Sequence, residues 1–347
     1  MSRLAFPLGL FLAALTNAQG QWRIQESHTN AGLRGIHSIG NGIAWASGSG
    51  GTVLRTTDGG GNWQTCTVPP GAEKLDFRGI QAFDRNSAIV LSSGKGDLSR
   101  LYKTTDGCRT WRLILTNPDP EGFWDAVRFT SGVGLLCGDP VEGKFVEFTT
   151  SDFGEHWLRS SQVPSAREGE SLFAASNSSL LFLHAGGNAL IVTGGTSGSR
   201  SIAEIAGGDI PLAVSESAGA FSVATAPTIL VAVGGDYRKP DISAGTAAFS
   251  ADGGQHWTAA TTPPHGYRSS VAYDSPRKTW IAAGPNGTDI STDDGRNWRP
   301  LGTDRNWNAL SLPFVVGSNG RIGKQFRRAP KPPERAAAGK IARPTWP

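Results

Sequence analysis

A short motif that recurs five times along the chain limits the folds open to it. Each copy has Ser or Thr, any residue, Asp, any residue, Gly, two further residues and Trp, except that Cys108 replaces Gly in the second copy. Successive motif tryptophans are 48, 46, 100 and 41 residues apart, so the unit near residues 169–208 has lost its motif. The copies contain the pairs Asp58 and Trp63, Asp106 and Trp111, Asp152 and Trp157, Asp252 and Trp257, and Asp293 and Trp298.

The motif has the chemistry of a reinforced hairpin turn. Its hydroxyl and its carboxylate can accept hydrogen bonds from backbone N–H groups in the turn, and Gly supplies the positive φ that other residues resist. The Trp ring can bury a large flat surface against neighbouring structure. Five such hairpins in register, with a period of about 40 to 50 residues, predict a β-propeller in which each period is one four-stranded blade.

The composition agrees with an all-β chain. Of 347 residues, 46 are Gly and 21 are Pro, while only 18% are charged and Met occurs once. This balance argues against a coiled coil, a helical bundle or a charged disordered chain, and it suits short strands joined by tight turns. No Gly-rich motif follows a strand and opens a helix, so we expect no nucleotide or dinucleotide site.

Alternating apolar runs predict seven blades between Trp22 and Phe326. Residues 308–324 are too few for four strands, so the strand-like segment 22–28 is expected to supply the missing outer strand and to close the ring. The expected fold class is therefore an all-β, seven-bladed β-propeller with its ring closed by an N-terminal strand. The innermost strands are expected to begin near Leu33, Phe77, Phe123, Ser171, Leu212, Ser269 and Asn308.

The five motifs resemble those of the Asp-box, or BNR, propeller family. This family includes sialidases, some plant-polysaccharide hydrolases, sortilin-like receptors and photosystem II assembly factor propellers. The resemblance covers residues 22–326 and is closest in style to the assembly-factor-like and sialidase-like members. The boxes are structural in all of these proteins, so the resemblance implies the fold and does not imply an activity.

The two ends of the chain differ from the repeat region. Residues 1–18 have a basic start, an apolar run and small residues at their end, the pattern of a cleaved secretory signal. We therefore expect a signal peptide (1–18), a propeller (19–326) and a tail (327–347) in an exported protein, periplasmic or extracellular.

The excess of positive charge lies at the C-terminal end of the chain. Residues 321–347 contain eight Lys or Arg and one acid, which leaves 25 basic and 28 acidic residues in the rest of the chain. The propeller itself is slightly acidic, so we expect no nucleic-acid partner. The many prolines of residues 327–347 predict a disordered tail. This tail is expected to be either simply solvated or docked on an acidic partner or an anionic surface.

Three cysteines in an exported chain cannot all pair with one another. Cys66 follows the first box and Cys108 lies within the second, so both belong to the outer, lower rim of adjacent blades, and we predict a disulfide between them. Cys137 is expected in a buried strand. The six histidines have no metal-ligand spacing and there is no Cys-x-x-Cys pattern, so we expect no metal and no cofactor.

The loops on the face opposite the boxes are expected to line the mouth of the central channel. One interpretation is a polar pocket for an anionic or sugar-like ligand, with Arg34, Arg78 and Arg268 as forked donors to a carboxylate. The other is that these arginines pair with acids of neighbouring blades and fill the funnel. Further candidate ligand-binding residues at the mouth are Trp124, Lys95 and Asp236, and the same loops carry Asp125, Asp139, Glu168, Glu170, Tyr237 and Tyr267.

Two functions from different classes are compatible with these residues. We favour a monomeric, non-catalytic binding or assembly module without a transmembrane span, whose mouth face holds a protein partner or a glycan. The alternative is a sialidase-like glycoside hydrolase in which Tyr237 is the nucleophile, Glu170 or Glu168 assists it and Asp125 is the acid. That mechanism requires the Tyr237 hydroxyl to lie within hydrogen-bond reach of a carboxylate. Gly-Ile follows Arg34 and Arg78, so the Arg-Ile-Pro motif of sialidases is absent.

Overall fold

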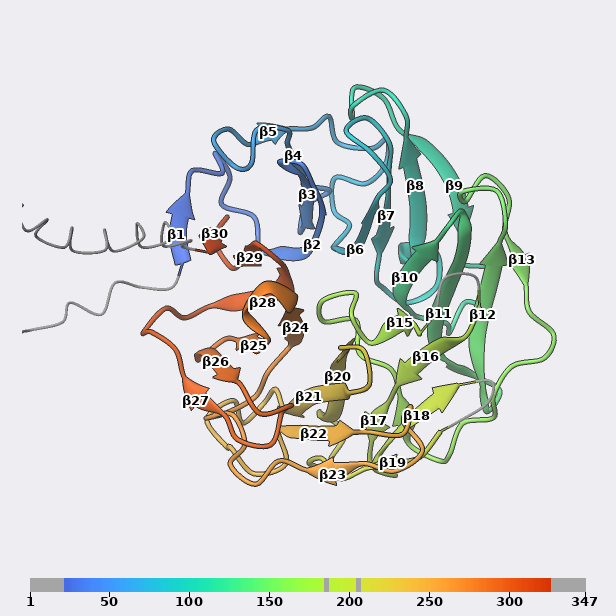
Figure 1. Ribbon diagram of the computed structural model, residues 1–347. Helices are drawn as coiled ribbons and strands as arrows, with labels where there is room; N and C mark the ends of the chain where they lie inside the picture. The colour runs from blue at the N-terminus through green and yellow to red at the C-terminus, as the bar shows by residue number, and fades with distance from the viewer. Residues whose placement is uncertain (1–21, 184–186, 204–206, 326–347) are drawn as a thin grey trace, which may run out of the picture.

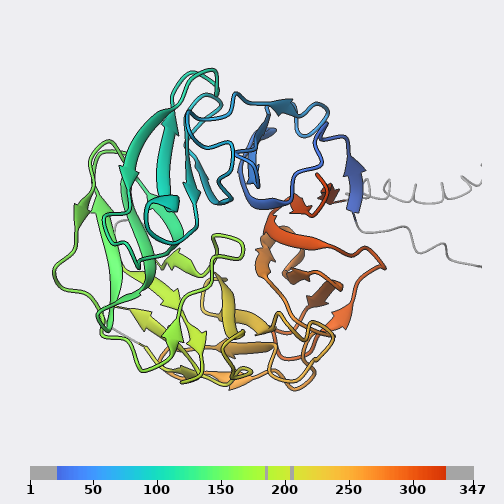
Figure 2. The same ribbon diagram turned by 180° about the vertical axis from the view of Figure 1, so that it is seen from behind.

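The computed structural model describes residues 22–183, 187–203 and 207–325. In this part of the chain seven sheets stand around a central axis, and the colours of Figure 1 follow them once around the ring. Figure 2 shows the same ring from behind. This confirms the predicted seven-bladed β-propeller. The expected signal peptide (1–18) and tail (327–347) lie outside the described residues.

Each of the first three blades is an antiparallel sheet of four strands, ordered from the axis outward. A short 3₁₀ helix, η1(Gly96–Leu98), joins the second and third strands of blade 2. Blade 1 contains β2(Leu33–Gly40), β3(Ile43–Gly48), β4(Val53–Thr56) and β5(Gln64–Thr65). Blade 2 contains β6(Phe77–Ala82), β7(Ala88–Ser92), β8(Arg100–Thr104) and β9(Arg112–Thr116). Blade 3 contains β10(Trp124–Thr130), β11(Val133–Val141), β12(Lys144–Thr150) and β13(Leu158–Arg159).

Blades 4 to 6 repeat this order. A second 3₁₀ helix, η2(Ser275–Arg277), follows the first strand of blade 6. Blade 4 contains β15(Leu180–Phe182), β16(Ala189–Val192), β18(Ser199–Ala203) and β19(Asp209–Ile210). Blade 5 contains β20(Ala218–Thr225), β21(Leu230–Asp236), β22(Ala247–Ser250) and β23(Thr258–Ala259). Blade 6 contains β24(Ser270–Asp274), β25(Thr279–Gly284), β26(Gly287–Ser291) and β27(Arg299–Pro300).

Blade 7 combines both ends of the described chain. Its strands are β28(Trp307–Ser311), β29(Phe314–Gly317) and β30(Ile322–Gln325), with β1(Trp22–Gln25) as the outermost strand. The two outer strands are antiparallel, with Trp22 opposite Gln325, and they lie side by side in both views (Figures 1 and 2). The Trp22 ring packs edge-on against Trp307, and its Nε1 donates to Thr288 Oγ1 of blade 6 at 3.2 Å. The N-terminal strand therefore closes the ring as predicted.

The expected starts of two innermost strands are wrong. In blade 4 the innermost strand begins at Leu180 and not near Ser171, and in blade 5 it begins at Ala218 and not near Leu212. Glu170 and Ser171 instead form β14(Glu170–Ser171), which pairs with β17(Gly194–Gly195), and β17 pairs with β20, so that β14 and β17 extend the sheet of blade 5 to six strands. The apolar residues that follow β14 are buried inside the channel. Their sequence pattern is the same as that of a buried inner strand.

The five motifs form nearly identical hairpins, here called box hairpins, between the third and fourth strands of their blades. In each, the Ser or Thr hydroxyl accepts the N–H four residues later at 2.9 to 3.1 Å. The same hydroxyl donates to the Asp carboxylate at 2.7 to 3.0 Å. Hydrogen bonds from the backbone and side chain of Asn62 lower the pKa of Asp58 to about 2, so the first box carboxylate stays ionised down to strongly acidic pH.

The box hairpins define one face of the ring, here called the box face. Each of the first three hairpins touches the turn between the first and second strands of its own blade. The N–H of Gly59 donates to Gly42 O at 2.8 Å, and that of Phe153 donates to Gly132 O at 3.0 Å. The loops that enter the innermost strands therefore lie on the opposite face, here called the mouth face.

Cys66 and Cys108 form a disulfide that links blades 1 and 2 beside the box face, as the sequence predicts. Thr67 Oγ1 donates to Cys108 O at 2.8 Å, and Trp111 Nε1 donates to Thr67 O at 3.0 Å. Cys108 takes the Gly position of its box with φ +63°, so a covalent link stands at a turn that usually needs glycine. Cys137 is buried in β11.

The core consists of apolar clusters between neighbouring blades. One cluster joins Trp45 of blade 1 to Phe77 and Tyr102 of blade 2. Trp45, Trp124, Trp280 and Trp307 are fully buried. In the described segments no helix has the length and apolar character needed to cross a bilayer. Across the same residues, no three His, Cys, Asp or Glu side chains gather as they would around a metal ion.

We predict that removing a single box hydroxyl destabilises the propeller. Ser250 Oγ is buried, accepts the Gly254 N–H at 2.9 Å and donates to Asp252 Oδ1 at 2.8 Å. Ser250→Ala leaves a buried N–H without a partner and should lower the free energy of unfolding by about 1–3 kcal/mol. Urea unfolding measures the effect, with Ser275→Ala, an exposed position, as the matched control. Equal stability of the two variants would contradict the role of the hydroxyl.

Candidate functional site

A loop crosses the central channel and divides it in two. Residues 172–179, here called the central loop, lie between β14 and β15, and Figure 1 shows this segment reaching the middle of the ring. Ser176 Oγ donates to Ser269 O of blade 6 at 2.7 Å. Asn177 Oδ1 accepts the Val127 N–H of blade 3 at 2.8 Å, and Asn177 Nδ2 donates to Val127 O at 3.0 Å. The central loop is therefore held by blades on both sides of the axis and forms a floor for each half of the channel.

The half that opens on the mouth face is a cavity of about 570 Å³, here called the mouth cavity. Arg34 and Arg78, at the entry of β2 and β6, form one wall. The Nε of Arg78 lies 2.9 Å and that of Arg34 3.8 Å from Asp76 Oδ2, and both side chains remain partly exposed. Arg78 also donates to Ala174 O of the central loop at 3.3 Å. One carboxylate thus orients two guanidinium groups without using up all their donors.

An aromatic wall faces the same cavity from blades 4 to 6. The rings of Phe173 and Phe221 are stacked with centroids 3.9 Å apart. Tyr267 packs edge-on against Phe221 at 4.8 Å, and burial raises the pKa of Tyr267, so its phenol stays neutral. Tyr237 packs against the same ring at 6.1 Å but is 45% exposed, so it lies at the rim. A ligand in the mouth cavity would therefore meet arginines on one side and ring faces and edges on the other.

Two buried carboxyl groups also line the mouth cavity. Burial, and then the charge of Asp139, raise the pKa of Asp125 well above its usual range, while Arg78 partly opposes this shift. Burial raises the pKa of Asp139 to about 6, although Asp139 Oδ1 accepts the Leu172 N–H at 2.8 Å. Asp125 Oδ2 is buried and has no hydrogen-bond partner among the described residues. Two neighbouring buried carboxyls cannot both ionise readily, so the pair retains at least one proton near neutral pH.

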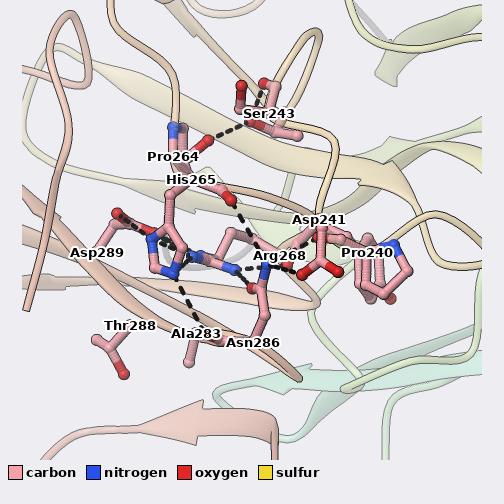
Figure 3. A network of polar contacts seen from close by, with 12 residues as sticks. Pro240, Asp241, Ser243, Pro264, His265, Arg268, Ala283, Asn286, Thr288 and Asp289 are labelled. Atoms are coloured by element: carbon pink, nitrogen blue, oxygen red, sulfur yellow. Dashed lines mark hydrogen bonds and ion pairs between the residues drawn. The ribbon is translucent and has the colours of Figure 1, made fainter. Parts of the chain in front are cut away.

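Arg268, predicted as the third ligand donor, is instead a buried structural residue, and that prediction is wrong. Figure 3 shows its guanidinium enclosed by His265, Asn286 and Asp289. Its Nε donates to Asp289 Oδ2 at 2.7 Å and its Nη1 to Tyr267 O at 2.7 Å. The side chain is 0% exposed, so it cannot reach a ligand. Arg268 does fill the funnel as one half of an ion pair, but its partner Asp289 belongs to the same blade and not, as expected, to a neighbouring one.

The other predicted site residues are only partly brought together. Trp124 is fully buried against Phe148 and cannot contact a ligand, so its predicted role is wrong. Lys95 pairs with Glu121 at 2.5 Å on the exposed rim and does not line the mouth cavity. Asp236 accepts Ser217 Oγ at 2.6 Å and orders the loop beside Tyr237, but it does not line the cavity either.

The predicted hydrolase residues do not form a catalytic set. The Glu170 carboxylate is fully buried and accepts Arg200 Nε at 2.7 Å and Thr193 Oγ1 at 2.7 Å. Although burial raises the pKa of Glu170, hydrogen bonds from Arg200, Thr193 and the Arg167 N–H together lower it below its usual value. The Tyr237 hydroxyl makes no hydrogen bond to any carboxylate of the described residues. The assignment of Tyr237 and Glu170 as a nucleophile pair is therefore wrong, while Asp125 does line the cavity.

Sequence reasoning missed three residues of this site. Asp76 stands two residues before Arg78 at a strand entry, a spacing that could have indicated a partner for the arginine. Phe173 and Phe221 form the centre of the aromatic wall. No local signal distinguishes these two from other buried aromatic residues, because they meet across two blades.

The chain is similar to known proteins in fold. No protein-family model matches the sequence, and neither does any curated protein. Among solved structures the chain is similar to YCF48 bound to D1 peptide, with TM-score 0.60 and 18% identity over 89% of this chain and 98% of that one. YCF48 from Cyanidioschyzon merolae gives TM-score 0.60 and 19% identity over 88% and 98%.

An enzyme is also among the similar folds. The GH74 xyloglucanase from Xanthomonas campestris gives TM-score 0.60 and 14% identity, covering 88% of this chain and 54% of that one. At these identities the likeness establishes the propeller fold alone. Proteins with this fold include both a peptide-binding protein and a glycoside hydrolase, so the fold does not decide between the two functions.

We predict that the buried carboxyl pair makes stability depend on pH. The pKa of Asp139 is about 6 in the folded protein and near 4 when unfolded, so the folded state holds the proton more tightly. The resulting stabilisation is complete below about pH 4 and is lost as pH rises through 6. Relative to Asp139→Asn, the wild-type free energy of unfolding should fall by up to about 3 kcal/mol between pH 4 and pH 7. Urea unfolding at several pH values measures this, and parallel curves would contradict it.

Proposed function

We propose that this chain is a non-catalytic binding module that takes a carboxylate-bearing segment of a partner protein into the mouth cavity. The observation that carries the proposal is the pairing of Arg34 and Arg78 on one wall with stacked aromatic rings on the other. Guanidinium groups match the two oxygens of a carboxylate, and the rings offer apolar contact to the residues beside it. The absence of an assembled tyrosine and glutamate pair among the described residues supports a role without catalysis.

The size of the mouth cavity supports a short segment as the ligand. Its volume of about 570 Å³ is within the range of roughly 300–1,000 Å³ that small ligands occupy. It can hold a few side chains or a chain end, and a folded domain would stay outside. YCF48, which has a similar fold, has been solved with a D1 peptide bound, and this supports a peptide as the class of ligand here.

We propose further that the protein is exported to the periplasm or the cell exterior. The apolar segment in residues 1–18 has the pattern of a secretory signal. The Cys66–Cys108 disulfide supports this compartment, because disulfides persist mainly where thiols are not kept reduced.

We predict that both mouth arginines contribute to peptide binding. In fluorescence anisotropy with a labelled pool of random peptides that lack Asp and Glu and have free carboxyl termini, Arg34→Gln and Arg78→Gln should each weaken binding at least tenfold, through loss of a charge-assisted hydrogen bond. Arg299→Gln, at an exposed strand position, is the matched control and should bind like wild type. A pool with amidated termini should bind weakly.

Two outcomes would contradict this function. Equal affinity for the free and amidated pools would show that the mouth cavity does not recognise a carboxylate. Turnover of fluorogenic glycosides by the wild type that is abolished by Asp125→Asn would show that the protein is a glycoside hydrolase.

We predict that the full chain, produced in a bacterium with a secretion system, is processed after Ala18 and collects outside the cytoplasm. N-terminal sequencing of the periplasmic and cytoplasmic fractions measures this. Recovery of only cytoplasmic protein that still begins at Met1 would exclude the signal peptide.

A further inference from the structure

A second cavity occupies the other half of the channel. It has a volume of about 470 Å³ and lies on the box-face side of the central loop. Its lining comes from the ends of innermost strands, with His37 of β2, Arg128 of β10, Tyr273 of β24 and Ser311 of β28. Ser178 of the central loop lines it as well, so the loop separates it from the mouth cavity. We call it the box-face cavity.

Arg128 is the residue that gives this cavity its chemistry. Within the described part of the chain its guanidinium has neither an ion-pair partner nor a hydrogen-bond acceptor, and no Asp or Glu lines the cavity. Burial lowers the pKa of Arg128, with no acid to oppose the shift. By contrast, Arg34 and Arg78 share Asp76, and Arg268 is paired with Asp289. Arg128 is half-buried, and its guanidinium faces the cavity without a counter-charge, so the cavity has a positive potential that favours an anion from solution.

His37 adds a neutral donor to the same cavity. Its Nδ1 accepts the Ala82 N–H at 2.9 Å. Burial, and then the charge of Arg128, lower the pKa of His37 to about 3, so the ring is neutral at pH 7. A neutral ring whose Nδ1 accepts must carry its proton on Nε2. His37 therefore has one N–H left to donate.

Two hydroxyl groups complete the set of donors. Ser311 Oγ accepts the Ser38 N–H at 2.9 Å, which leaves its own O–H free to donate. Tyr273 lines the cavity from blade 6, next to the blade of Ser311. Donors thus come from blades 1, 3, 6 and 7, on different sides of the axis. An anion with oxygens in several directions suits this arrangement better than a planar carboxylate, whose two oxygens face one guanidinium.

We propose that the box-face cavity is a binding site for a tetrahedral oxyanion, phosphate or sulfate, either free or carried on a larger molecule. Arg128 supplies the charge, and His37, Ser311 and Tyr273 supply further hydrogen bonds. The site is independent of the mouth cavity, because the central loop lies between them.

The test uses the full chain and inorganic phosphate as the probe. At pH 7 and constant ionic strength, 10 mM phosphate should raise the melting temperature of the wild type by about 2 °C through mass action. Arg128→Met should abolish the shift, and in chloride buffer it should be at least as stable as wild type, because the uncompensated charge is gone. Titration calorimetry should show at least tenfold weaker phosphate binding for Arg128→Met.

Controls separate this site from general anion effects and from the proposed function. Arg299→Gln removes an exposed charge and should keep the full phosphate shift. Sulfate should act like phosphate, and acetate should not. Binding of carboxyl-terminal peptides at the mouth should be unchanged in Arg128→Met. If Arg128→Met does not fold, Arg128→Lys, which keeps a point charge, should retain a weaker shift.

Three results would overturn the proposal. The first is an equal phosphate shift in wild type and Arg128→Met, or in wild type and Arg128→Lys if only that variant folds. The second is the absence of any shift at 10 mM phosphate. The third is an equal effect of acetate, which would show that the cavity does not select tetrahedral anions.

Discussion

Closure of the ring by pairing of β1 with β30 is the interaction on which the other features of this protein depend. Each blade buries its faces only against its neighbours, and an open row of seven sheets would expose an apolar face at each end and leave β30 without an outer partner. The pairing of Trp22 with Gln325 gives β30 its outer partner, and the packing of Trp22 against Trp307 helps to cover those faces. Because the ring is closed, the entry loops of all seven innermost strands meet around one axis, and this makes a shared site possible.

Blade 4, one of the two blades without a box hairpin, also shapes the channel. Before blade 4 the chain forms β14, which joins the sheet of blade 5, then crosses the axis as the central loop and only afterwards begins the innermost strand of blade 4. Polar side chains hold this loop, with Asn177 against blade 3 and Ser176 against blade 6. A propeller channel that would otherwise run through the ring becomes two cavities with separate linings.

The two cavities differ in their charge balance. In the mouth cavity two arginines share Asp76, and the buried pair Asp125 and Asp139 retains a proton, so charge is nearly compensated. In the box-face cavity Arg128 has no acid among the residues that line it. This difference arises from the strand ends: acids at the entry ends of the inner strands line the mouth cavity, whereas Asp274, at the far end of β24, pairs with Arg277 and does not line the box-face cavity. A ligand of the mouth cavity must therefore compete with Asp76 for the arginines, whereas the box-face cavity favours a free anion.

Short-range chemistry in the chain was sufficient for the architecture. The five motifs specified hairpins through contacts within eight residues, and their spacing indicated the blades and the closing strand. The partners of individual side chains depended on the fold: Arg268 meets Asp289 and is buried, Glu170 meets Arg200, and Phe173 meets Phe221 across blades. The inner strands of blades 4 and 5 were misplaced because a buried loop and a buried strand have the same apolar pattern. Hairpin geometry is local, whereas burial and pairing at the axis arise only when distant blades come together.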